Sequence, residues 1–177
     1  MSALASAKSK SLTEFDQQYI ASIYKAIEHS QATIEFDLNG VVLSANANFL
    51  ALFGYALEDL PGKPHDQLCV AGAAESEENI SLWKKLRAGE PVNGEFHRSA
   101  ADGRDRYVQA TYVPILDAAG KPCKIVQIAT DITASKVKLL ENDGKMTAIN
   151  RTQAEIEFDM DGIVLTANQK FLKIFNY

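Results

Sequence analysis

The chain has 177 residues, of which 18 are basic and 23 acidic, giving a net charge of −5 at neutral pH. This balance excludes a basic nucleic-acid binder, and a hydrophobic fraction of 46% is enough for a full globular domain. The longest apolar runs are only a few residues long, as at 163–165, so no membrane span is predicted. Residues 1–8 lack the apolar core of a secretory signal, and we expect a cytoplasmic protein.

The cysteines and histidines do not follow a metal-binding pattern along the chain. Cys69 and Cys123 lie 54 positions apart and form no CxxC pair, which argues against both a disulfide framework and a zinc site. His29 and His97 have no metal-like spacing with His65. We therefore expect reduced thiols and assign no metal.

Segment 1–31 is predicted to be an N-terminal flanking helix. A capping box between Ser11 and Glu14 starts it, and it runs to about residue 30. Its apolar residues cover about half of the helix surface at about 100° per residue, which is wide for a helix with one neighbour. They are Phe15, Tyr19, Ile20, Ile23, Tyr24 and Ile27. We expect this helix to cover the outer face of the predicted sheet, which Val126, Ile128 and Tyr107 make apolar, with a second copy of the chain as partner.

Segment 32–133 is predicted to be an α+β domain with one antiparallel sheet. Runs of alternating character predict five strands, at 33–37, 41–44, 93–99, 106–115 and 124–130. Asn39-Gly40 is typical of a tight hairpin turn between the first two. Because the helices fall between the second and third strands, we expect them to pack together on one face of the sheet.

The helices of this domain carry recognisable ends. Asn46 is expected to cap a short helix that ends at Gly54. Residues 76–87 predict a longer helix with Ile80, Trp83 and Leu86 on its apolar face.

Segment 134–153 is predicted to be a linker or signalling helix. Ile132, Leu139 and Met146 recur at steps of seven, which is the spacing of a coiled-coil seam. Asn142-Asp-Gly144 is expected to weaken the helix in its middle.

The chain contains an internal repeat with an offset of 122 residues. Residues 32–55 recur as 154–177, and 14 of the 24 aligned positions are identical. We interpret 154–177 as the truncated start of a second domain, and the chain as a piece of a longer protein. A lone hairpin of this kind is marginal in water, so we expect it to be disordered or paired with a neighbouring molecule.

The ordered motifs of 32–133 resemble a PAS domain. They comprise Phe36-Asp37 with Gly40, Ala45-Asn46 followed by Phe49-Leu50 and Phe53-Gly54-Tyr55, Leu60-Pro-Gly-Lys63, Asp102-Gly103, Tyr112-Val-Pro-Ile-Leu-Asp117 and Asp131-Ile-Thr133. Two such units in tandem are similar to the cytosolic sensor region of methyl-accepting chemotaxis transducers of the biofilm-dispersion type. The resemblance implies a homodimeric signal-input module, not an enzyme, with a downstream methyl-accepting coiled-coil signalling domain in the same chain.

The resemblance also implies a ligand pocket between the inner face of the sheet and the short helices. Strand alternation then assigns the inward residues on the sheet. The expected pocket residues are His65, Trp83, Phe96, Arg98, Val108, Ala110, Tyr112, Gln127, Ala129, Phe49 and Phe53. Asp131 and Thr133 are expected to couple the domain to the outgoing helix. The dimer is expected to involve Phe15, Tyr19, Ile23, Ile27, Ile132, Leu139 and Met146.

Four of these residues have alternative interpretations. His65 either faces the pocket, where it binds a ligand or heme iron, or bonds backbone in a Pro-rich turn. An inward Arg98 needs either an anionic ligand or a carboxylate partner such as Glu95 or Asp105. Gln127 and Tyr112 either orient a ligand or bond each other across the sheet.

The sequence therefore predicts a sensory module that binds a small molecule or cofactor, with two alternatives. One is a ligand-free module for dimerisation or protein interaction, which a core filled by Trp83, Tyr112 and Phe96 favours. The other is a heme or flavin redox sensor, although His65 at the position of the flavin-reactive cysteine disfavours flavin–thiol photochemistry. The chain has no nucleophile elbow, P-loop or HExxH motif, so an enzyme is not expected.

Overall fold

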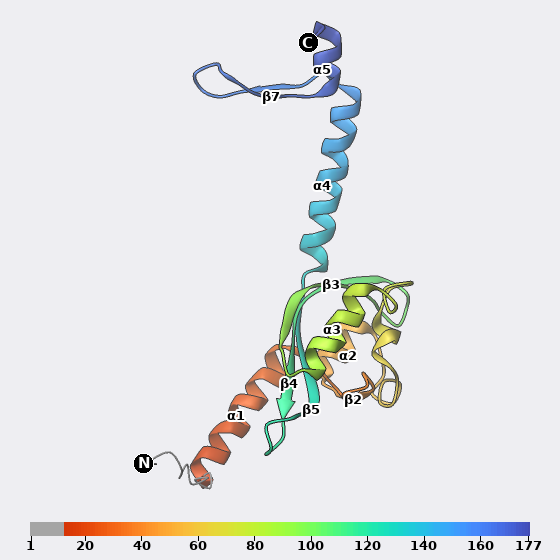
Figure 1. Cartoon of the computed structure of the whole chain (residues 1–177), viewed down its shortest axis with the longest axis vertical. Coiled ribbons are helices and arrows are strands. Elements are labelled where there is room, and N and C mark those ends of the chain that lie inside the picture. The colour runs from red at the N-terminus through yellow and green to blue at the C-terminus, as the bar shows by residue number, and fades with distance from the viewer. Residues whose placement is uncertain (1–12) are drawn as a thin grey trace, which may run out of the picture. The chain divides into compact units, whose positions relative to one another are not determined.

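The computed structural model describes residues 13–177 and divides the chain into two compact units, Met1–Asp131 and Ile132–Tyr177 (Figure 1). Each unit is described by itself. Within the described residues, no helix combines the length and the apolar character that crossing a bilayer requires.

The first unit is built on a five-stranded antiparallel sheet with the strand order β2-β1-β5-β4-β3. Its strands are β1 (Ala32–Phe36), β2 (Val42–Ala45), β3 (Val92–Ser99), β4 (Asp105–Leu116) and β5 (Pro122–Asp131). The five strands expected from the sequence are thereby confirmed, with ends that move by one or two residues. The first strand of this unit, β1, pairs with its last strand, β5, so residues far apart in the sequence lie side by side in the sheet.

Alternation along the strands decides which side chains enter the core. In β4, Val108, Ala110 and Tyr112 are buried, whereas Gln109 and Thr111 between them are exposed. Successive side chains of a strand point to opposite faces, so one face of the sheet belongs to the core and the other does not. The inward assignment made from the sequence is confirmed for this strand.

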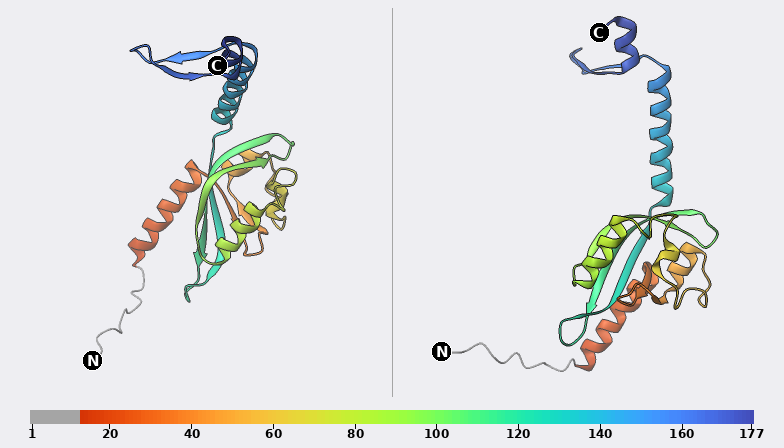
Figure 2. Two further views of the ribbon diagram at one scale, coloured as in Figure 1. Left: turned by 45° about the horizontal axis from the view of Figure 1, so that its top comes forward. Right: turned by 45° about the vertical axis from the view of Figure 1, so that its right-hand side comes forward.

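Three helical segments cover the inner face of the sheet, and one helix lies on the other side (Figures 1 and 2). The inner segments are α2 (Ala47–Phe53), the 3-10 turn η1 (His65–Leu68) and α3 (Glu77–Arg87), and the outer one is α1 (Glu14–Ser30). Asn46 caps α2 by accepting the backbone N–H of Phe49, and α2 ends at Gly54 with φ of +71°, as expected.

Two local expectations about the helices are wrong. The capping box of α1 joins Thr13 and Asp16, so the helix begins at Glu14, and Ser11 lies outside the described residues. Ile80 is 60% exposed, because α3 turns Leu82, Trp83 and Leu86 toward the core.

The second unit contains α4 (Thr133–Thr152), β6 (Ile156–Phe158), β7 (Val164–Ala167) and α5 (Gln169–Phe175). The helix α4 continues through Asn142-Asp-Gly144, where one internal Gly costs about 1 kcal/mol relative to Ala. The hairpin and α5 repeat the order and register of β1, β2 and α2. The sequence repeat is therefore also a structural repeat.

Candidate functional site

The side chains expected to line a pocket lie in the core of the first unit. Ten of them are buried and Phe96 is partly buried against the same core. The ten are Phe49, Phe53, His65, Trp83, Arg98, Val108, Ala110, Tyr112, Gln127 and Ala129. The structure thus brings together the residues that the sequence assigned to the inner face, η1, α2 and α3.

Aromatic rings fill the space between the sheet and the helices. The ring of His65 contacts those of Phe36, Trp83 and Tyr112 edge to face, with centroids 5.4, 5.3 and 6.0 Å away. Phe96 packs in the same way on Tyr112 at 5.2 Å. Such contacts are favourable packing beyond the burial of area alone. A heme or flavin does not fit between sheet and helices in this arrangement, because the rings occupy that space.

A chain of buried polar contacts crosses this core. Nη2 of Arg98 donates to the hydroxyl of Tyr112 at 3.2 Å, and Nε2 of His65 lies 3.3 Å from the same oxygen. Nδ1 of His65 faces Sγ of Cys69 at 3.7 Å. Arginine can only donate hydrogen bonds, so the Tyr112 hydroxyl accepts from Arg98 and can itself donate a hydrogen bond to His65. The chain therefore links the edge strand β3 to the turn η1 through β4.

Arg98 is stabilised by neutral partners. Of the two carboxylates considered from the sequence, Asp105 lies 2.8 Å from Nε2 of His97. Arg98 donates to the carbonyl of His97 at 3.1 Å and lies 4.9 Å from the centre of the Phe96 ring. Its Nε atom is buried and has no hydrogen-bond partner among residues 13–177.

Burial determines which groups in this chain of polar contacts are protonated. It lowers the pKa of His65 to about 3, with a further contribution from the charge of Arg98, so the imidazole is neutral at physiological pH. Burial raises the pKa of Tyr112 and of Cys69, and Arg98 opposes both shifts. Tyr112 and Cys69 therefore carry their protons, and Arg98 supplies the positive charge of the group.

Gln127 is the inner-face residue whose polar group is least satisfied. It lies opposite Tyr112 in the register of β4 and β5, yet the Tyr112 hydroxyl bonds Arg98 and His65 instead. Within the described part of the chain, Oε1 of Gln127 is buried without a partner. Unpaired buried acceptors are costly, so this position is a weak point of the core.

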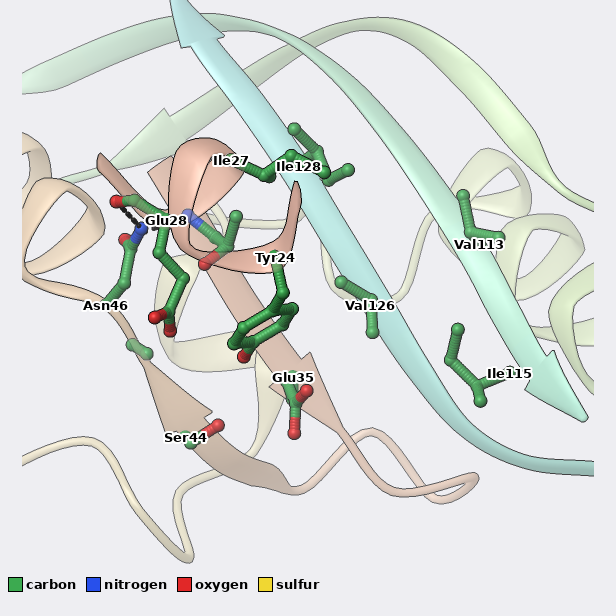
Figure 3. A pocket seen from close by; sticks show the side chains of 12 residues that line it. Tyr24, Ile27, Glu28, Glu35, Ser44, Asn46, Val113, Ile115, Val126 and Ile128 are labelled. Carbon is green, nitrogen blue, oxygen red and sulfur yellow. Dashed lines mark hydrogen bonds between the residues drawn. The ribbon is translucent and has the colours of Figure 1, made fainter. Parts of the chain in front are cut away.

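The outer face of the sheet carries an apolar recess next to α1. This outer recess has a volume of about 310 Å³ and lies between α1 and strands β1, β2, β4 and β5 (Figure 3). Its apolar lining is made by Tyr24, Ile27, Val113, Ile115, Val126 and Ile128. In Figure 3 the Tyr24 ring extends from α1 toward Glu35, while Val126 and Ile128 lie along β5. Only the end of α1 therefore borders the outer face.

Most of the apolar face of α1 is in contact with solvent. Phe15 is 75% exposed, Tyr19 60% and Ile23 44%, and only Ile27 among the expected dimer residues of this helix is half-buried. In the second unit, Leu139 and Met146 are also exposed, and Ile132 is half-buried. Contiguous exposed apolar side chains are typical of an interaction surface.

A second, more polar recess opens at the edge of the sheet. This edge recess, of about 310 Å³, lies between the residues around the start of α3 and strand β3, and Asn79, Leu82, Phe96 and Arg98 contribute to its lining. In the part of the chain that the structure describes, Oδ1 of Asn79 and Nε of Arg98 are both buried without a hydrogen-bond partner. The edge recess is the cavity that contains two of the residues expected to bind a ligand.

The expected coupling residues lie at the end of the last strand. Asp131 is the last residue of β5, and Thr133 is the first residue of α4. Ile132 between them is the N-cap residue of α4, and α4 has no side-chain cap. The sheet and the outgoing helix are therefore separated by a single residue of the chain.

Comparisons with known proteins place this architecture in a family. The PAS fold profile matches residues 28–137. The chain is 42% identical over 152 residues to the biofilm dispersion protein BdlA of Pseudomonas aeruginosa, covering 86% of this chain and 36% of that protein. It is 28% identical over 120 residues to the aerotaxis receptor of Escherichia coli, covering 68% and 23%. The chain thus spans about a third or less of these relatives.

Solved structures agree with this assignment. The PAS domain of a Colwellia psychrerythraea protein is 24% identical, covers 66% of this chain and 98% of its own, and superposes with a TM-score of 0.60. A light-oxygen-voltage domain studied with a flavin analogue is 19% identical, covers 76% and 99%, and has a TM-score of 0.55. At these identities the likeness concerns the fold alone. Sheet order, inner helices and sequence relatives agree, and the chain belongs to the PAS family.

Proposed function

We propose that this chain is the sensory PAS region of a cytosolic bacterial signal transducer of the chemotaxis type, and that it works as a homodimer. The observation that carries the proposal is the apolar outer recess of the sheet next to the solvent-exposed apolar face of α1. The relationship to BdlA and to the aerotaxis receptor supports a sensory role. A signal-input module fits these relatives better than an enzyme does.

The dimer would pair the outer faces of two copies. Tyr19, Ile20 and Ile23 of one copy would fill the outer recess of the other, and the symmetric arrangement would repeat this contact. The same helix that borders the recess carries the exposed side chains, so one surface supplies both halves of a self-complementary interface. This contact removes from water the apolar side chains that α1 exposes in a single chain.

The signal would enter through the core and leave along α4. A small polar ligand in the edge recess could bond Arg98, whose other contacts reach Tyr112 and His65. Because β5 ends at Asp131 and α4 begins at Thr133, movement of the sheet would act on α4 and then on a downstream methyl-accepting coiled-coil domain. A ligand that favours one arrangement shifts the equilibrium by its differential affinity.

A second candidate function is a ligand-free dimerisation module. The filled core favours it, since Trp83, Tyr112 and Phe96 occupy the interior where a larger ligand would bind. Native mass spectrometry of the purified protein separates the two candidates. A dimer with additional non-protein mass supports a ligand-binding sensor, and a dimer of bare polypeptide mass supports the ligand-free module.

The dimer itself is tested by sedimentation with matched charge substitutions. Ile128→Glu in the outer recess and Ile20→Glu on α1 are expected to convert the dimer to a monomer. Ile80→Glu, at an exposed isoleucine on α3, should leave the dimer intact. A wild-type monomer, or equal dissociation of all three variants, would contradict the proposed interface.

A further inference from the structure

The turn η1 gathers three side chains with metal-ligating atoms. His65 and Asp66 begin the turn, and Cys69 directly follows it. One ligand atom from each lies within 4.8 Å of the other two, and this is the only cluster of that kind among residues 13–177. The spacing of histidines along the sequence did not reveal it, because a single turn brings these three residues together.

The separation of the two softer ligands matches a tetrahedral metal site. Zinc binds imidazole nitrogen at about 2.0–2.1 Å and thiolate sulfur at about 2.3 Å, which separates the two ligand atoms by about 3.6 Å at a tetrahedral angle. Nδ1 of His65 and Sγ of Cys69 are 3.7 Å apart. The pair therefore already has the spacing that a shared metal ion requires.

The surrounding fold holds the two ligands in place. The backbone N–H of His65 donates to the carbonyl of Gly40 at 2.7 Å, and Cys69 forms an isolated bridge with Arg98 on β3. The His65 ring is enclosed by the aromatic rings of the core, so Nδ1 stays directed at Cys69. A site held by packing and backbone bonds loses little freedom when it binds an ion.

Tyr112 provides the outer contact that metal-binding histidines use. A metal at Nδ1 places the imidazole proton on Nε2, from which it can be donated to the Tyr112 hydroxyl 3.3 Å away. That oxygen has two lone pairs and can accept from His65 and Arg98 together. The hydrogen bond fixes the ring orientation from the side opposite the metal.

Charge and access also suit a dication. Binding of a dication would release the thiol proton of Cys69 to solvent, and the resulting thiolate and the carboxylate of Asp66 together offset two positive charges, while the imidazole is a neutral ligand. Asp66 is exposed and Cys69 is half-buried, so an ion reaches the cluster from solvent. A set of one sulfur, one nitrogen and one oxygen ligand is typical of borderline metals and leaves a fourth position for water.

We propose that His65, Asp66 and Cys69 form a binding site for one divalent cation of the zinc class. His65 also belongs to the chain of polar contacts in the core. A bound cation would therefore fix the tautomer of His65 and thereby alter its hydrogen bond with Tyr112. It does not depend on the dimer, because all three ligands come from one turn of one chain.

The test uses the full chain, treated with a chelator and kept reduced, and titrated with Co²⁺ and then with Zn²⁺. One equivalent of Co²⁺ should produce a sulfur-to-metal charge-transfer band, which Zn²⁺ displaces. Cys69→Ser should abolish this band, and the matched variant Cys123→Ser should retain it. Competition with a chromophoric chelator should show at least a tenfold loss of zinc affinity in Asp66→Asn.

Asp66 is exposed, so Asp66→Asn tests the site in a chain whose fold is not disturbed. The fluorescence of Trp83, whose ring centroid is 5.3 Å from that of His65, gives an independent reading of binding. Co²⁺ should quench it in wild type and in Cys123→Ser. Absence of one-to-one binding, a band that survives in Cys69→Ser, or a band that is lost in Cys123→Ser would overturn the site.

Discussion

Asn168 repeats the hydrogen bonds of Asn46, 122 residues further along the chain. Oδ1 of Asn46 accepts the backbone N–H groups of Thr33 and Phe49, each at 2.9 Å, and Nδ2 donates to two carbonyls at the end of α1 at 2.9 and 2.7 Å. Asn168 makes the corresponding four contacts with Glu155 before β6, with α5 and with the end of α4, at 2.8 to 3.3 Å. The equivalent asparagine thus joins each repeat to the helix that precedes it.

Replacing Asn46 should therefore loosen three elements at once. Asn46→Ala removes the cap of α2 and the contacts to β1 and α1, and we expect the free energy of unfolding to fall by about 2–3 kcal/mol. Urea unfolding followed by Trp83 fluorescence measures the change. Asn48 donates to the same two carbonyls of Glu28 and Gln31 but caps nothing, so Asn48→Ala should cost about 1 kcal/mol. Equal losses in the two variants would contradict the role of the cap.

Removal of one hydroxyl group should destabilise the polar chain of the core. Tyr112→Phe leaves Nη2 of Arg98 and Nε2 of His65 buried without the oxygen they share, and we expect a loss of about 2 kcal/mol. Thermal unfolding by circular dichroism measures it. Tyr55→Phe is the control, because the Tyr55 hydroxyl makes a single long contact of 3.5 Å at the surface. A Tyr112 variant as stable as the control would show that these polar contacts do not contribute to the stability of the protein.

Acid should destabilise the first unit through His65. The pKa of His65 is lowered to about 3 in the folded protein, while the unfolded chain binds the proton at about 6.5. The unfolded state therefore holds more protons between these values, and stability falls as pH drops through this window. We expect the free energy of unfolding to be roughly 2 kcal/mol lower at pH 5 than at pH 7.

Urea unfolding over this pH range, with a chelator present, measures the dependence on His65. His65→Gln should remove most of it, whereas His97→Gln, at a histidine outside the core, should keep it. If His65→Gln unfolds with the same pH dependence as the wild type, the buried neutral imidazole is not its cause.

Gly40 should tolerate no side chain, for two reasons that a control can separate. Its φ is +82°, and a Cβ added there would meet the indole of Trp83 at 3.0 Å. Gly103 has a φ of +79° but no atom within 4 Å of the added Cβ, so Gly103→Ala reports backbone strain alone. We expect losses of about 1 kcal/mol for Gly103→Ala and about 2–4 kcal/mol for Gly40→Ala. Chemical denaturation measures both, and equal losses would mean that Trp83 moves aside freely.

Local rules were sufficient to predict the elements of the first unit. The cap at Asn46, the helix end at Gly54 and the alternation in β4 depend on neighbouring residues, and all three are confirmed. The same rules failed for the rotation of α3, where the spacing of apolar residues and their packing favour different faces of the helix. Spacing by three placed Ile80 on the inner face of α3, whereas the packing of Leu82 and Trp83 sets the rotation of that helix.

The candidate site was harder to predict than the helices and strands, because it depends more on contacts between residues far apart in the sequence. Burial of Arg98 followed from strand parity, but its neutral partner Tyr112 lies on another strand and could not be deduced from spacing. The apolar outer face followed from strand parity, but the outer recess depends on how much of that face α1 leaves uncovered, which no local pattern encodes. The cluster around His65 depends on the conformation of a 3-10 turn, whereas local rules predict only a Pro-rich irregular segment there.

The helix α4 has consequences for how the chain can be shortened. Asn168 takes two of its acceptors from the last turn of α4 and the residue that follows it, the carbonyls of Asn150 and Gln153. A shorter chain that begins at residue 154 would keep the whole hairpin and α5 but remove both acceptors, although no residue of the hairpin itself is lost. A cut at residue 132 would keep them. The natural boundary between the two repeats is therefore the start of the helix, not the start of the strand.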